Sequence, residues 1–342
     1  MKTLFAYIFL LVAALSGCKK SGNASTPNPP VTTSTFAKGA DISWLTQMEA
    51  SGYKFYTAAG TVMDCMQLMQ TLGINSIRLR VWVNPSDGWC NTADLVAKAI
   101  RAKNLGLRIL LDIHYSDVWA DPAHQTKPAA WAAYDFATLK TTVNSYTLGV
   151  MNALKANGVV PSWVQIGNET NDGMLWPDGR ASVNMANFAA LVSAGYSAVK
   201  SINDSIKVIV HVSNGYDNSL FRWMFDGLKA NGASWDIIGM SLYPTSANWQ
   251  SYNTSCLANM NDMVSRYGKQ VMICEVGMPV TDAAICQSFI TDLVSKTKSV
   301  AGNNGLGVFY WEPECYNNWQ GYGLGAFDNS GKPTVAMNAF AN

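Results

Sequence analysis

From Phe36 onward, short apolar runs of strand length alternate with longer segments in which apolar residues recur at helical spacing. The run from Leu107 to Ile113 is almost continuously apolar, which is typical of parallel strands buried on both faces. In the segment from Thr61 to Leu72 the apolar residues fall on one helical face, and Gly73 ends the predicted helix. The runs of strand type cover residues 36–42, 74–82, 107–113, 163–167, 206–212, 237–244, 270–275 and 307–313.

Helical segments separate these runs, and this alternation predicts parallel βα units. A closed (β/α)8 barrel, or TIM barrel, of about 250 residues plus insertions accounts for most of the 342 residues. The long insertion over 119–131 follows the third run, at the end of the barrel where long loops usually carry function. We therefore expect one α/β barrel domain.

Two of the strand runs lead into a glutamate. The fourth run is followed by Asn168 and Glu169, and the seventh ends in Glu275. Glycoside hydrolases place two carboxyl groups on either side of the glycosidic bond, one to protonate the leaving oxygen and one to attack the sugar or to activate water. A single glutamate at a strand end is more often a surface or ion-pair residue, but two of them on matching strands, with Asn168 beside one, favour catalysis.

The N-terminal segment has the pattern of an export signal. Lys2 precedes the apolar run Leu4 to Leu15, which is too short for a permanent membrane helix and has the length of a signal-peptide core. The residues before and including Cys18 resemble the lipobox of bacterial lipoproteins; the alternative is an ordinary signal peptide cut nearby. We expect a lipoprotein signal peptide over 1–17, a flexible tether over 18–35 carrying lipid on Cys18, and a catalytic domain over 36–342.

This anchor predicts an exported protein that is attached to the outer membrane. Lys19 and Lys20 at the start of the tether lack the acidic run of some surface-exposed lipoproteins. We expect the protein to face the cell surface, and the periplasmic face stays open.

Charge and composition indicate which classes of molecule the protein can bind. Lys and Arg together number 24 against 23 Asp and Glu, so no basic surface for nucleic acid is expected. The chain has 12 Trp and 14 Tyr, which either pack in the core or stack on sugar rings. By position, Trp82 and Trp119 near the predicted top face suit stacking, whereas Trp44 suits packing. Asp117 either binds sugar hydroxyls or caps a turn.

Cysteines and histidines point to no metal. Six cysteines besides Cys18 make disulfides possible in an exported chain but do not require them, and 15 pairings are open. No spacing of cysteine or histidine is typical of zinc. The six residues are Cys65, Cys90, Cys256, Cys274, Cys286 and Cys315.

Three sequence blocks together resemble glycoside hydrolase family 53: Ile77 to Val83, Leu111 to Pro122 and Gln165 to Glu169. The resemblance extends from about Phe36 to the C-terminus. It implies a retaining endo-β-1,4-galactanase that acts on galactan or type I arabinogalactan. In the family pattern, Glu169 is the general acid/base and Glu275 is the nucleophile.

The resemblance also implies roles for residues around the two glutamates. We expect Arg80 to lie beside Glu275 and to keep it ionised, because a neighbouring arginine favours the charged form of a carboxylate. The other expected substrate-binding residues are Asn168 at the sugar 2-hydroxyl, Tyr243 at the nucleophile, Trp311 as floor of the central subsite, and His114 and His211 as supports of the two carboxylates.

Bacterial members of the family often carry a calcium loop after the seventh strand. Here that loop, Gly277 to Ala284, is short and has one carboxylate, whereas calcium takes six or more oxygen ligands. We therefore expect no calcium site, no cofactor, and a monomer. Two alternatives stay open, namely the same barrel acting on mannan or cellulose, and a non-catalytic glycan-binding lipoprotein.

Overall fold

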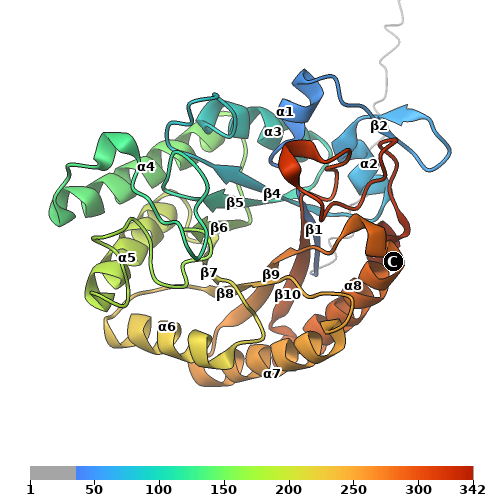
Figure 1. Ribbon diagram of the computed structural model, residues 1–342. Coiled ribbons are helices and arrows are strands. Elements are labelled where there is room, and N and C mark those ends of the chain that lie inside the picture. Colours follow the sequence, from blue (N-terminus) through green and yellow to red (C-terminus); the bar gives the residue numbers. More distant parts are fainter. Residues whose placement is uncertain (1–35, 342) are drawn as a thin grey trace, which may run out of the picture. The chain divides into compact units, whose positions relative to one another are not determined.

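The computed structural model describes residues 36–341, and these form a closed barrel of parallel strands surrounded by helices (Figure 1). The strand order around the barrel is β1-β10-β9-β8-β7-β6-β5-β4, so the first and last strands pair and close it. This confirms the predicted (β/α)8 fold. The strands are β1 Ala37–Asp41, β4 Ser76–Val81, β5 Arg108–Ile113, β6 Trp163–Ile166, β7 Lys207–Val212, β8 Ile237–Leu242, β9 Gln270–Val276 and β10 Gly305–Trp311.

Most of the α-helices begin after an Asp or Asn whose side chain caps the first turn. Asp135 accepts a hydrogen bond from the backbone N–H of Thr138 at 2.8 Å, and Gly268 ends α7 with φ of 64°. The helices are α1 Leu45–Ala50, α2 Cys65–Thr71, α3 Thr92–Asn104, α4 Phe136–Ala156, α5 Met185–Ile202, α6 Asn218–Ala230, α7 Trp249–Tyr267 and α8 Ala283–Lys298, followed by the 3₁₀ segment Val335–Phe340.

The predicted helix over 61–72 begins later than expected. Its first residues form β3, Val62–Met63, which pairs with β2, Phe55–Tyr56, in a hairpin outside the barrel. Helix α2 starts at Cys65 because the Asp64 side chain caps it, accepting from the backbone N–H of Gln67 at 3.0 Å. The helical spacing was therefore correct for the second part of the segment only.

The barrel interior is apolar at its amino-terminal end. Gly39 lies against the Phe309 ring, and a Cβ at that position would come within 2.0 Å of it, so only glycine fits. This apolar cluster fills the amino-terminal half of the barrel interior, and polar side chains occupy the carboxyl-terminal half. Its members are Ala37, Leu110, Trp163, Ile209, Ile237, Met272, Cys274 and Phe309.

All six cysteines of the described part are buried and unpaired, so the disulfides that the sequence permitted are not formed there. Between residues 36 and 341, no helix has both the length and the apolar character needed to cross a membrane. The predicted signal peptide, the tether and Cys18 lie outside the described residues.

Candidate active site

Glu275 faces the barrel interior because strand β9 is irregular. Met272 and Cys274 already belong to the inner apolar cluster, so strict alternation would turn Glu275 outward. A register shift against β8 occurs after Met240, and Ser241 then pairs with Glu275. The irregularity directs the carboxylate into the site, which is a common use of a β-bulge.

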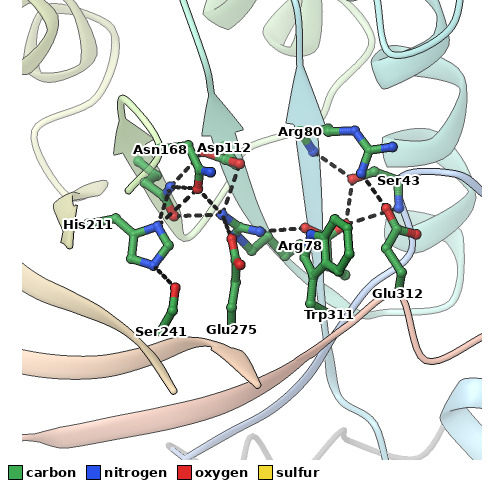
Figure 2. A network of polar contacts seen from close by, with 12 residues as sticks. Ser43, Arg78, Arg80, Asp112, Asn168, His211, Ser241, Glu275, Trp311 and Glu312 are labelled. Atoms are coloured by element: carbon green, nitrogen blue, oxygen red, sulfur yellow. Dashed lines mark hydrogen bonds and ion pairs between the residues drawn. The ribbon is translucent and has the colours of Figure 1, made fainter. Parts of the chain in front are cut away.

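Arg78 on β4 contacts three buried carboxylates at once (Figure 2). Its guanidinium lies 2.8 Å from Glu275, 2.7 Å from Asp41 and 2.9 Å from Asp112. It also donates to the side-chain oxygen of Asn168 at 2.9 Å. One side chain thus connects the ends of β1, β5 and β9 with the loop after β6.

The prediction that Arg80 lies beside Glu275 is wrong. Arg80 forms an ion pair with Glu312 instead, and its backbone N–H donates to the Ser43 hydroxyl at 2.8 Å. Arg80 lies two residues, or about 6.6 Å, nearer the carboxyl end of β4 than Arg78. At that height its neighbours are the segments that follow β1 and β10.

Glu169 lies in the turn after β6 and has a left-handed backbone with φ of 43°. Beside it, Asn168 donates one amide hydrogen to the Ala120 carbonyl at 2.8 Å. The Asn168 oxygen accepts from Gln165 at 3.0 Å as well as from Arg78. The amide is therefore held in one orientation, with one N–H left for a substrate hydroxyl.

The two glutamates differ in their immediate partners. Burial raises the pKa of Glu169 to about 7. Burial also raises the pKa of Glu275, and the charge of Glu169 raises it further, while Arg78 opposes the rise. The Tyr243 hydroxyl donates to Glu275 at 2.9 Å, as the sequence predicted. In a pair that shares one proton, the ion pair with Arg78 and the hydrogen bond from Tyr243 place the negative charge on Glu275 and the proton on Glu169.

His211 supports the acid side of the site. Its Nε2 lies 2.7 Å from the Ser241 hydroxyl, and its Nδ1 lies 2.9 Å from the amide nitrogen of Gln165. Burial and then the charge of Arg78 lower the pKa of His211 well below its usual value, so the ring is neutral near pH 7. The Ser241 hydroxyl in turn lowers the pKa of Glu169, opposing the effect of burial.

His114 supports the other side through Asp112. Its Nδ1 accepts from the Trp82 indole at 3.3 Å and from the Ala120 backbone N–H at 3.2 Å. The proton therefore sits on Nε2, which donates to Asp112 at 2.8 Å. Each predicted histidine thus lies next to the carboxylate network, as a positioning group rather than at the open surface.

An aromatic cavity of about 330 Å³ lies at the carboxyl-terminal end of the barrel, where residues at or after the ends of β1, β4, β5 and β10 line it. Arg80 lies beneath its rings, with Cζ at 4.9, 5.1 and 4.4 Å from the centroids of Trp44, Trp82 and Trp119. Trp119 is 36 % exposed and offers a stacking surface. The lining consists of Trp44, Gln47, Trp82, Asp87, Trp119, Trp311, Gln320, Gly321 and Tyr322.

Three of the predicted tryptophans, Trp82, Trp119 and Trp311, line this cavity, and so does Trp44, which the sequence assigned to packing. Asp117 takes the structural one of its two predicted roles, because its oxygens accept the backbone N–H groups of Asn84 at 2.9 Å and Ala129 at 2.8 Å.

Glu312 is a site residue that the sequence analysis missed. It accepts the backbone N–H of Trp44 at 3.1 Å in addition to its ion pair with Arg80. The signal was present, because Glu312 directly follows the last barrel strand, and Glu169 likewise lies just beyond the end of the fourth.

Comparisons with known proteins agree with this geometry. The profile of glycosyl hydrolase family 53 matches residues 37–340. A probable arabinogalactan endo-beta-1,4-galactanase A of Aspergillus fumigatus is 36 % identical over 306 residues, covering 82 % of this chain and 85 % of that protein.

Solved structures show the same relationship. One from a study of two fungal beta-1,4-galactanases superposes with a TM-score of 0.82 at 31 % identity, covering 89 % of this chain and 98 % of the other. The GH53 catalytic domain of Ignisphaera aggregans gives 0.81 at 29 % identity, covering 92 % and 98 %. The chain therefore belongs to glycosyl hydrolase family 53.

Proposed function

We propose that the protein hydrolyses internal β-1,4-galactosidic bonds in galactan and type I arabinogalactan, with retention of anomeric configuration. The observation that carries this proposal is the asymmetry in the contacts of the carboxyl pair: Glu275 forms an ion pair with Arg78 and accepts a hydrogen bond from Tyr243, whereas the side-chain partner of Glu169 is the neutral Ser241 hydroxyl. The substrate is taken from the relatives, which are named as galactanases.

In the first step, the Glu275 carboxylate attacks the anomeric carbon while Glu169 gives its proton to the 4-oxygen of the leaving sugar. The bond between C1 and that oxygen breaks, and a glycosyl ester of Glu275 forms. The remaining N–H of Asn168 donates to the 2-hydroxyl, a contact that strengthens as positive charge develops on the ring.

In the second step, Glu169 acts as base. It takes a proton from water as the water oxygen attacks C1, and Glu275 leaves as a carboxylate. Glu169 is then protonated again, so one water molecule is consumed and both side chains return to their starting states. Galactan has an axial 4-hydroxyl that bends the polymer, so its selection over mannan or cellulose requires a groove of matching shape.

The proposal is tested by comparing Glu275→Ala with Glu169→Ala on an activated aryl β-galactobioside in the presence of azide. Both substitutions should lower kcat on galactan by more than about 10³-fold. Azide should then restore turnover in both variants. With Glu275→Ala it attacks C1 directly and gives the α-azide, whereas with Glu169→Ala it opens the ester and gives the β-azide.

Reducing-sugar release from unbranched galactan, mannan and carboxymethylcellulose by the wild type identifies the polymer. Cleavage of mannan or cellulose alone would keep the mechanism and replace the substrate. Binding of galactan with no bond cleavage would instead favour the glycan-binding alternative and refute both carboxylate roles.

We further propose that the mature chain is exported and anchored by lipid on Cys18 at the outer membrane, facing the cell surface. The support is the apolar run from Leu4 to Leu15 followed by the lipobox-like residues. Mass spectrometry of the mature N-terminus tests this, since Cys18→Ser should abolish lipid attachment and leave the protein in the aqueous phase after detergent partitioning. Protease accessibility on intact cells separates the two membrane faces.

A further inference from the structure

Behind the aromatic cavity, a buried cluster of acid and thiol groups has no part in the mechanism above. Glu312, Glu314 and Cys315 follow β10, and one carboxylate oxygen of each glutamate and the Cys315 sulfur all lie within 4.8 Å of one another. Both glutamates are 0 % exposed and Cys315 is 2 % exposed.

Glu314 is the part of this cluster that lacks an explanation. Its carboxyl group can form a hydrogen bond with the Glu312 side chain only if one of the two glutamates carries a proton; as carboxylates, neither oxygen of Glu314 has a partner among the residues the structure describes. The two arginines of the barrel are engaged elsewhere, since Arg78 contacts three other carboxylates and Arg80 pairs with Glu312. A second carboxylate buried against Glu312 without a cation or donor is costly, and such groups are normally paired or bound to metal.

We propose that Glu312, Glu314 and Cys315 form a structural site for one thiophilic divalent cation, with zinc as the representative ion. Two carboxylates and a thiolate are ligands that zinc accepts, whereas calcium requires six or more oxygens. The ion neutralises the two adjacent carboxylates, and Cys315 binds as a thiolate, so binding releases the thiol proton to solvent.

The backbone that carries these ligands is held in place. The Glu312 N–H donates to the Asp41 carbonyl at 2.9 Å, and the Cys315 N–H donates to the Glu312 carbonyl at 3.2 Å. The Pro313 carbonyl accepts the Ala326 N–H at 2.7 Å. Two ligands of a tetrahedral zinc ion are separated by roughly 3.3–3.8 Å, so small side-chain rotations bring the three ligand atoms to that spacing.

A fourth ligand and an entry route are also available. The Met48 sulfur lies 3.9 Å from the Cys315 sulfur, and thioethers suit soft metal ions. Cys315 also lines a cavity of about 220 Å³ together with Tyr316 and Asn317, from which an ion can reach the thiol. A bound ion would fix Glu312, and through it the backbone of Trp44 at the edge of the aromatic cavity.

The test uses the full chain without a histidine tag and with Cys18→Ser in every sample, so that the only thiols are the six buried ones. After chelator treatment and gel filtration, zinc or cobalt is added back and the metal content is measured. We expect one equivalent per chain, a thiolate-to-cobalt charge-transfer band, and a rise in Tm of roughly 5 °C at a zinc concentration of about 100 Kd. Calcium should produce no shift.

Matched variants locate the ion. Cys315→Ser should abolish the cobalt band, and Glu314→Gln should abolish the zinc-dependent rise in Tm, whereas Cys256→Ser, a buried thiol on α7, should leave both unchanged. His124→Ala removes an exposed ring 3.0 Å from Asp121 and should also leave both unchanged.

Two results would overturn the proposal. One is metal binding that survives both Cys315→Ser and Glu314→Gln, which would place the ion elsewhere. The other is the absence of a bound equivalent in the wild type. In that case an infrared carbonyl band that Glu314→Gln removes would identify a proton, shared between the two glutamates, as the neutralising charge.

Discussion

Two arginines on β4, Arg78 and Arg80, are both buried in the barrel, yet their surroundings differ. Arg78 is surrounded by three carboxylates, and Arg80 pairs with Glu312 and lies beneath three indole rings. The first serves the chemistry by setting the charge of Glu275. The second serves binding by supporting the aromatic cavity. The catalytic part of the site, around Arg78, and the aromatic cavity that binds sugar, around Arg80, are thus separated by only two residues along β4.

Replacing each arginine by lysine, one at a time, tests most directly whether Arg78 and Arg80 have different roles. Lysine keeps the charge of Arg78 but loses the planar fork that reaches several partners. We expect Arg78→Lys to lower kcat on galactan by roughly 10²–10³-fold and the free energy of unfolding by roughly 3 kcal/mol. Steady-state kinetics and urea unfolding measure these two effects.

Arg80→Lys is the matched control. It should change kcat by less than about threefold and act mainly on KM, because Arg80 supports rings and does not contact either catalytic glutamate. An equal loss of kcat in both lysine variants would show that the two arginines form one functional unit.

A smaller effect is expected at Tyr243, which touches only the catalytic half. A hydrogen bond to a charged group contributes about 1.5–3 kcal/mol, so Tyr243→Phe should lower kcat by roughly 10–100-fold. Losing this donor also raises the pKa of Glu275, because the hydrogen bond favours the ionised form. Since Glu275 acts as a carboxylate, the acidic limb of the pH–rate profile should move to higher pH. An unchanged acidic limb would contradict the assignment of the charge to Glu275.

The smallest expected effect is on the pH dependence of activity that the general acid Glu169 sets. Burial raises the pKa of Glu169 to about 7, and the charge of Asp121 contributes to the rise. Glu169 acts in its protonated form, so activity should fall as the pH rises through about 7. Asp121→Asn removes one charge that favours the proton, and the alkaline limb should move to lower pH. Asp117→Asn, which changes a charge engaged with loop backbone, should leave that limb in place.

The sequence predicted the barrel and the two glutamates because both follow from simple patterns. Strand-length apolar runs set the βα order, and strand ends set where Glu169 and Glu275 emerge. Arg78 and Arg80 alternate with Ile77 and Leu79 and therefore lie on the same face of the strand, but the alternation does not say which arginine reaches Glu275, since that depends on height within the closed barrel. The register shift that turns Glu275 inward leaves no mark in the sequence pattern, because strict alternation from Met272 and Cys274 would turn Glu275 outward.

Glu312 was missed for another reason, and so was the place of Trp44 in the cavity lining, although Trp44 does pack in the core as predicted. Their contact joins the segment after the first barrel strand to the segment after the last, 268 residues apart. Only closure of the barrel between β1 and β10 brings them together. Glu312 also has a left-handed backbone, with φ of 47°, a conformation that is uncommon for a residue other than glycine and that the sequence pattern does not predict.

Arg78 also has a consequence for evolution and engineering. The single positive charge of Arg78 faces three carboxylates, so the fold does not require the negative charge of Glu275. Because the pKa of Glu275 is raised in the folded protein, its ionisation at neutral pH lowers the free energy of unfolding. Activity is then maintained at the expense of stability. The inactive Glu275→Gln protein should melt at a higher temperature than the wild type at pH 7, and a lower Tm would show that the nucleophile also strengthens the fold. Selection for thermal stability alone would therefore favour variants that lose catalytic activity and keep the barrel fold.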